Sequence, residues 1–164
     1  MSTPIQLNSS ARLSEHFTLG EFTRSGHPEI YNIPSHEAIA NLKRLCQWLE
    51  VLRERYNAKF AKFWRICNAP EHKVIINSGY RSPQLNRKVG GAPTSNHLTG
   101  CAVDVRTSGL PQAIRYAAIL LDYADETHQD FDELLIEKNR HGAVWLHFAV
   151  RPRENRRKLL FINA

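Results

Sequence analysis

The chain has 164 residues, of which 42% are hydrophobic and 23% charged, with a formal net charge of +6 and a pI near 9.5. This length suits one domain whose core needs no disulfides, and no apolar run reaches the roughly 20 residues of a transmembrane helix. The positive charge favours anionic partners such as nucleic acid, acidic wall polymers or a membrane surface.

The N-terminal segment has neither a basic start nor a hydrophobic stretch, so we expect no signal peptide and synthesis in the cytosol. Residues 1–12 are polar and are predicted to form a flexible segment before a single domain of residues 13–164. Cys46, Cys67 and Cys101 show no paired spacing, which is typical of a reducing compartment and of small core residues.

The first predicted helix begins at Thr18, because Thr18-Leu19-Gly20-Glu21 has the pattern of a capping box. The stretch from Gly26 to Pro34 predicts a loop, and Ser35 is a good N-cap for a helix from His36 to Tyr56. Apolar residues recur along this helix at spacings of three and four, which indicates one buried face. They are Ile39, Leu42, Leu45, Leu49 and Leu52.

The middle of the chain predicts two short strands and two helices. The β-branched run Val74-Ile75-Ile76 predicts a buried strand. Pro83 can begin a short helix that runs through Val89 and ends at Gly90-Gly91. Cys101 to Arg106 predicts a second strand, and Pro111 to Thr127 predicts an amphipathic helix.

Two further strands are predicted near the C-terminus, Leu134 to Lys138 and Val144 to Val150, joined by a turn at Asn139-Arg140-His141-Gly142. Runs of helix and strand that do not strictly alternate indicate an α+β domain, with a small antiparallel sheet packed against helices. The basic residues that follow form either a solvated terminal extension or a binding patch. They are Arg151, Arg153, Arg156, Arg157 and Lys158.

His97, Asp104 and His147 are candidate ligands of one zinc ion per chain. Two imidazoles and a carboxylate suit zinc, and three protein ligands leave a fourth position for water, as in catalytic sites. Bound zinc would lower the pKa of that water to roughly 7. Cys101 lies between two of the candidates, but strand alternation would point it away from Asp104.

The longest motif starts with Ser78-Gly79-Tyr80-Arg81-Ser82-Pro83 and continues through Asn86 and residues 89–97 to Asp104. It resembles the M15 family of zinc peptidases, which includes D-alanyl-D-alanine carboxypeptidases and dipeptidases, and phage endolysins that cut peptidoglycan stem peptides. Trp145-Leu146-His147-Phe148 resembles the last ligand strand of that family.

Looser similarity at residues 17–23 and 131–137 extends the resemblance from about Leu13 to Arg157 and points to the short, phage-rich branch. The resemblance implies the fold of the hedgehog proteins and D-Ala-D-Ala peptidases. It also implies ligation of zinc by His97, Asp104 and His147.

Arg81 is the candidate for substrate recognition, because a guanidinium can hold a peptide carboxylate through two parallel hydrogen bonds. Near zinc it could also polarise the scissile carbonyl or stabilise an oxyanion, and the resemblance implies such a use. Ser95 either binds substrate or caps the local turn.

The general base is less directly indicated. Many M15 members have a carboxylate three residues before the last histidine, where this chain has Val144. Glu137 is the candidate general base: if the turn pairs Lys138 with Val144, Glu137 lies opposite Trp145 on the sheet face of His147 and could reach the bound water. His141 is the rival, because some carboxypeptidases of the family have an assisting histidine shortly before the last ligand.

The sequence thus predicts a monomeric zinc peptidase that acts on peptidoglycan stem peptides as a carboxypeptidase or endopeptidase. We expect no membrane insertion and no specific nucleic-acid partner, and a phage-type endolysin that reaches the bacterial wall once released. One alternative is a zinc-containing binding or structural module without activity. Another is nucleic-acid binding by the basic C-terminal residues. The remaining histidines are expected on the surface, namely His16, His27, His36, His72 and His128.

Overall fold

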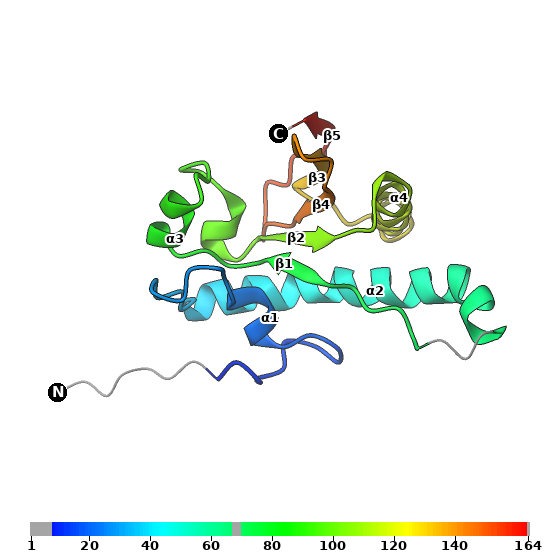
Figure 1. The fold of residues 1–164 in the computed structure, drawn as a ribbon, viewed down its shortest axis with the longest axis horizontal. Coiled ribbons are helices and arrows are strands. Elements are labelled where there is room, and N and C mark those ends of the chain that lie inside the picture. The colour runs from blue at the N-terminus through cyan, green and yellow to red at the C-terminus, as the bar shows by residue number, and fades with distance from the viewer. Residues whose placement is uncertain (1–7, 67–69, 164) are drawn as a thin grey trace.

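A computed structural model describes residues 8–66 and 70–163, so Cys67 and most of the predicted N-terminal segment lie outside the described residues. The described part contains helices and a five-stranded sheet, which confirms the predicted α+β class (Figure 1). The elements in chain order are α1 (Leu19–Thr23), α2 (His36–Ile66), β1 (Ile76–Ser78), α3 (Pro83–Lys88), the 3₁₀ helix η1 (Asn96–Thr99), β2 (Ala102–Arg106), α4 (Leu110–Thr127), β3 (Glu133–Lys138), β4 (Val144–Ala149) and β5 (Lys158–Asn163).

The strands form one sheet in the order β1-β2-β4-β3-β5. The first four pair antiparallel, as predicted, whereas β5 pairs parallel with β3 and makes the sheet mixed. The sequence reading that treated the C-terminal residues as a solvated extension or a binding patch missed β5. The apolar run Leu159-Leu160-Phe161-Ile162 within β5 is typical of a strand.

The register of the sheet divides its side chains between two faces. Lys138 pairs with Val144, as predicted, so Glu137 lies opposite Trp145 and Leu135 lies opposite His147. His147 also pairs with Asp104 on its other side, in β2. Because directly paired residues point to the same face, these side chains share one face of the sheet.

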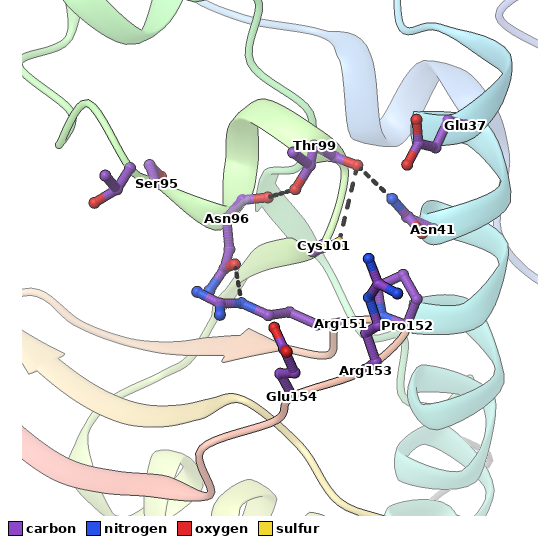
Figure 2. Close-up of a pocket in the computed structure, with 11 residues that line it drawn as sticks. Glu37, Asn41, Ser95, Asn96, Thr99, Cys101, Arg151, Pro152, Arg153 and Glu154 are labelled. Atoms are coloured by element: carbon purple, nitrogen blue, oxygen red, sulfur yellow. Dashed lines mark hydrogen bonds between the residues drawn. The ribbon is translucent and has the colours of Figure 1, made fainter.

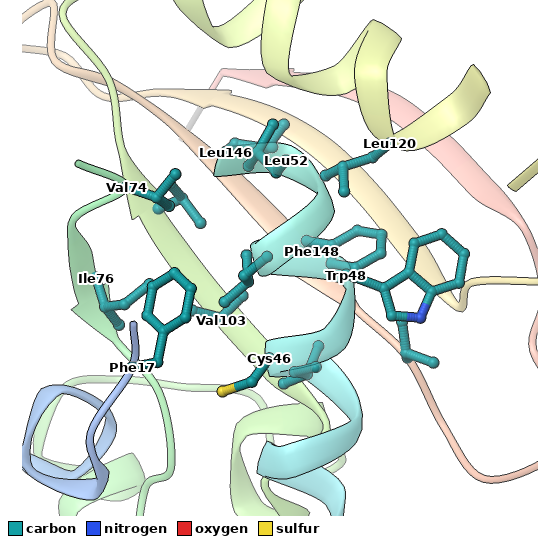
Figure 3. Packing of buried hydrophobic residues seen from close by; sticks show 14 of the residues in the cluster. Phe17, Cys46, Trp48, Leu52, Val74, Ile76, Val103, Leu120, Leu146 and Phe148 are labelled. Atoms are coloured by element: carbon teal, nitrogen blue, oxygen red, sulfur yellow. The ribbon is translucent and has the colours of Figure 1, made fainter. Parts of the chain in front are cut away.

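The opposite face of the sheet packs against α2 and α4 and forms the core. In Figure 3 Trp48 and Leu52 of α2 and Leu120 of α4 surround Phe148 and Leu146 of β4. The rings of Trp48 and Phe148 lie with their centroids 5.3 Å apart. The helices therefore cover one face of the sheet, and Asp104 and His147 lie on the other face.

The helix starts agree with the predictions, but one helix end does not. Glu21 accepts a hydrogen bond from the Thr18 amide at 2.7 Å, which completes the capping box of α1, and Ser35 accepts one from the Ala38 amide at 3.1 Å. Helix α2 continues to Ile66, beyond the predicted end at Tyr56. No helix of the described ranges combines the length and the apolar character needed to cross a membrane.

Tertiary hydrogen bonds explain why α2 does not end near Tyr56. Asn57 favours turns in isolation, but its side chain donates to the carbonyl of His72 and accepts from the His72 amide, both at 2.9 Å. These bonds fix the segment before β1 against the helix. They also leave His72 half-buried against Tyr116 instead of on the surface.

Candidate metal centre

Three residues from separate elements converge on one face of the sheet. Each of His97 in η1, Asp104 in β2 and His147 in β4 offers one ligand atom, and these atoms all lie within 4.8 Å of one another. Pairing of β2 with β4 places Asp104 directly opposite His147. The sheet therefore supplies two of the three groups, and η1 brings the third over them.

The position of His97 is set by both ends of η1. Ser95 caps the start by accepting a hydrogen bond from the His97 amide at 3.3 Å, and Gly100 ends the helix in the left-handed conformation. The ring Nδ1 lies 2.6 Å from the carbonyl oxygen of Gly79. Since a carbonyl only accepts, Nδ1 carries a proton, and in the neutral ring the lone pair is therefore on Nε2.

Glycine is required at position 79 for this contact. A Cβ there would lie 2.7 Å from the backbone oxygen of Phe22, far closer than van der Waals contact allows. The Tyr80 amide donates a hydrogen bond to the Phe22 carbonyl at 2.8 Å, which holds the backbone at Gly79 close to that of Phe22. The carbonyl of Gly79 is thus held where it can orient the His97 ring.

His147 lies between two carboxylates. Its Nδ1 is 2.9 Å from Oδ1 of Asp104, and its Nε2 is 3.1 Å from Oε2 of Glu133. Burial by itself would lower the pKa of His147, but the hydrogen bonds to Asp104 and Glu133 outweigh it and raise the pKa to about 9.

Asp104 contacts both histidines and Arg81. Its Oδ2 lies 3.4 Å from Nε2 of His97 and accepts a hydrogen bond from Nη2 of Arg81 at 2.9 Å. Burial opposes ionisation of Asp104, yet the charges and hydrogen bonds of His97 and His147 dominate and hold its pKa below the usual range. The carboxylate is therefore ionised and available as a ligand.

The chemistry of these donors fits zinc. Two imidazole nitrogens and a carboxylate oxygen lie within 4.8 Å of one another, and the other nitrogen of each ring is already hydrogen-bonded, to Gly79 or to Glu133. Such outer hydrogen bonds are the usual support of histidine ligands. Cys101 is buried outside this cluster, as strand alternation predicted.

Arg81 lies beside the cluster. Besides its bond to Asp104, its Nε donates to the Ser78 hydroxyl at 3.0 Å, and its backbone amide donates to the His97 carbonyl at 3.0 Å. The guanidinium is mostly buried, with 18% of the side chain exposed. Its predicted contact with substrate stays a prediction, although the group is next to the candidate ligands.

Glu137 and His141 occupy different surroundings. Glu137 is half-buried on the site face, and burial raises its pKa, with smaller effects from His147 and Asp104. His141 is exposed in the turn between β3 and β4, where Nε of Arg140 donates to its ring at 3.2 Å. Either role in proton transfer stays a prediction.

The sequence reading missed Glu133 and the residues that hold it. Glu133 contacts His147 directly and also bonds to Asn96 and Arg156. A signal was available, because extending the predicted register from Lys138 and Val144 by alternation places Glu133 on the same face as Glu137.

A cavity of about 310 Å³ lies behind η1, between the start of α2 and the segment after β4 (Figure 2). Ser95 and Asn96 contribute to its lining, as do Arg151 and Arg153, but none of the three candidate ligands does. Ser95 therefore acts as a cap in this structure, while its predicted contact with substrate stays a prediction.

Comparison with known proteins finds a family model that matches the chain. The family model described as Peptidase M15 matches residues 15–124. No curated protein sequence matches the chain. The matched region contains His97, Asp104 and Arg81, whereas β3 and β4, with Glu133, Glu137 and His147, follow its end.

Proposed function

The chain belongs to the peptidase M15 family and is a peptidase on that ground, and we propose that it is a zinc-dependent enzyme that hydrolyses peptidoglycan stem peptides. The observation that carries the zinc proposal is the convergence of His97, Asp104 and His147. In both histidines the second ring nitrogen is hydrogen-bonded to another group of the protein. Sites of this composition with three protein ligands are typically catalytic.

We propose one zinc ion per chain, bound by Nε2 of His97, the carboxylate of Asp104 and Nδ1 of His147. When bound, zinc supplies a Lewis acid and makes a water nucleophile available at neutral pH. The residues around it position the substrate and move protons.

Glu137 is the proposed general base. It accepts a proton from the attacking water at its carboxylate and returns that proton to the nitrogen of the leaving amine. Two features support this role: Glu137 shares the sheet face of His147, and burial raises its pKa toward the working range of a neutral-pH base. His141 is the alternative, in an exposed turn.

Arg81 is proposed to bind the substrate carboxylate or the oxyanion that forms at the scissile carbonyl. Only Nε and Nη2 of its guanidinium bond to Ser78 and Asp104 among the described residues, and a guanidinium carries five N–H donors. The remaining donors can face a ligand beside the metal position.

The test is mass spectrometry of purified sacculi and of soluble pentapeptide muropeptides after incubation with zinc-loaded protein. We expect a new product that is absent after chelation and with Asp104→Ala, and the mass of the product identifies the bond that is cut. Glu137→Gln should bind zinc stoichiometrically but lower kcat by about 10²- to 10⁴-fold. A larger loss in His141→Asn than in Glu137→Gln would transfer the role of base to His141.

A non-catalytic zinc module is the second candidate, favoured by Val144 at a position where many family members have a carboxylate. This candidate predicts stoichiometric zinc and good folding without any product from either substrate. Loss of a measured activity in Glu137→Gln, with zinc retained, would exclude it.

We further propose that the enzyme is a monomer that acts at the bacterial cell wall after release, as a phage-type lysin does. Nucleic-acid binding by the C-terminal arginines is less well supported, because several of them pair with carboxylates. Arg151 and Arg156 bond to Asp132 at 3.1 and 2.6 Å, and Arg157 bonds to Asp130 at 3.1 Å. These pairs reduce the local charge that DNA phosphates would neutralise.

A further inference from the structure

Glu133 contacts the nitrogen of His147 that faces away from the other candidate ligands. We propose that Glu133 is a positioning residue, which holds the proton of His147 on Nε2 and so presents Nδ1 to the metal. This inference rests on the zinc site proposed above and extends it to residues outside the ligand set.

Both oxygens of Glu133 are held in place. Oε2 lies 3.1 Å from Nε2 of His147 and accepts a hydrogen bond from Nδ2 of Asn96 at 3.1 Å. Oε1 accepts one from Nη2 of Arg156 at 2.9 Å. Since each oxygen has a partner, rotation of the carboxylate would break at least one of these bonds, and its direction toward His147 is fixed.

Asp132 in turn holds the two groups that hold Glu133. Its side chain is fully buried and accepts hydrogen bonds from Nδ2 of Asn96 at 2.7 Å and from Nε of Arg156 at 2.9 Å. Its amide donates to the Ala149 carbonyl, which ties the start of β3 to the end of β4. A buried carboxylate with this many partners fixes the geometry around it.

The resulting network reaches both histidine ligands. Asn96 precedes His97 in η1, while Glu133 lies opposite Ala149, two residues beyond His147. Arg156 comes from the segment between β4 and β5. Residues of three separate segments therefore meet at Glu133. Of the two network carboxylates, Glu133 and Asp132, Glu133 is the one that contacts a candidate metal ligand in the described part of the chain.

A carboxylate hydrogen-bonded to a histidine ligand fixes the tautomer and orientation of the ring, and its loss typically lowers metal affinity by about 10- to 100-fold. Without Glu133, the proton of neutral His147 would no longer be held on Nε2, and Nδ1 could carry it instead. The fraction of rings ready to bind would then fall. A purely structural ion pair would affect stability but not this tautomer.

The experiment measures zinc affinity by competition with a chromophoric chelator, beside the ¹⁵N chemical shifts of the His147 ring and the Tm of each metal-free variant. We expect Glu133→Ala to weaken zinc binding by about 10- to 100-fold and to change the ¹⁵N shifts of Nδ1 and Nε2. Glu133→Gln, whose amide oxygen can still accept from Nε2, should lose less affinity than Glu133→Ala.

Arg156→Ala and Arg157→Ala form a matched pair, because both remove a paired arginine but only Arg156 contacts Glu133. Weaker zinc binding in Arg156→Ala alone supports the proposal, and this pair decides the matter if Glu133→Ala does not fold. Wild-type affinity and unchanged ring shifts in folded Glu133→Ala, or in Arg156→Ala, would overturn the positioning role and leave the zinc site intact. Failure of the wild-type chain to bind zinc would overturn both proposals.

Discussion

His147 couples the protonation of this protein to its stability. Its pKa in the folded protein is raised to about 9, from an ordinary value of 6.5. Between these two values the folded chain holds a proton that the unfolded chain has released, so its stability falls as pH rises. Below 6.5 the stabilisation is fully present, and above 9 it is lost.

We therefore expect the free energy of unfolding of chelator-treated protein to decrease by about 1 to 3 kcal/mol between pH 6.5 and pH 9. Urea unfolding at a series of pH values measures this change. His147→Asn should remove the decrease, whereas His141→Ala, in an exposed turn, should keep it. A flat profile in the wild-type chain would contradict the prediction.

In the presence of zinc, the free energy of unfolding should instead rise with pH over this range, because His147 must lose its proton before Nδ1 can bind a metal. Calorimetric titration with zinc at pH 7, in buffers of different ionisation enthalpy, should show net release of about one proton per chain on account of His147. Binding without proton release would argue that His147 is not a ligand of the metal.

At the scale of elements, η1 depends on the glycine that ends it. Gly100 has φ +72°, and a Cβ there would lie 2.5 Å from the carbonyl oxygen of Ala38 in α2. Gly90 has the same φ but no atom within 4 Å of its Cβ position. A substitution by alanine would therefore strain the backbone at both positions, but only at Gly100 would the added methyl group also clash with a neighbouring atom.

Gly90→Ala should cost about 1 to 2 kcal/mol of stability from the left-handed backbone. Gly100→Ala should cost about 1 to 3 kcal/mol more, since the methyl group must displace η1 or α2. Urea unfolding of both variants gives the difference. Because η1 carries His97, zinc affinity should also fall in Gly100→Ala alone. Equal destabilisation of both variants would show that the contact with Ala38 is not limiting.

Element prediction succeeded where periodicity or a cap was local. The capping box at Thr18, the N-cap at Ser35 and the register of Lys138 with Val144 are confirmed. The end of α2 was wrong because Asn57 is satisfied by a residue distant in sequence. Strand β5 was missed although its apolar run is a local signal, and its partner could not be predicted locally, because β3 runs parallel to it and is separated from it in sequence by the whole of β4.

At the scale of the molecule, one cluster of buried side chains extends from Leu13 to Val150 and joins residues 13–22, α2, α4 and the sheet. Trp48 lies inside this cluster, whereas Trp145 is half-exposed on the opposite face of the sheet. A shared core of this kind favours cooperative unfolding.

We therefore expect one unfolding transition, in support of the single domain predicted for residues 13–164. Denaturant curves should coincide for far-UV circular dichroism and for the fluorescence of two single-tryptophan variants, Trp64→Phe with Trp145→Phe and Trp64→Phe with Trp48→Phe, each compared with its own circular dichroism. Curves that separate by more than the fitting error would indicate that the site face unfolds apart from the core.

The sequence by itself determined the identity of the candidate ligands and the register of β3 with β4, whereas the pairing of β2 with β4, which sets Asp104 opposite His147, was not predicted. His97, Asp104 and His147 stand in motifs whose residue types specify their chemistry, and alternation along β3 and β4 follows from local pattern. Such features depend on residues close in the chain, and physical rules for short segments suffice to find them.

Only the tertiary structure decided which groups orient those ligands. The Gly79 carbonyl lies 18 residues from His97, and Glu133 acts with Asn96 and Arg156, which lie 37 and 23 residues away. These contacts arise when the strands pair and the segment after β4 folds back over the start of β3. No local sequence pattern predicts these contacts, because their geometry depends on the packing of the whole sheet.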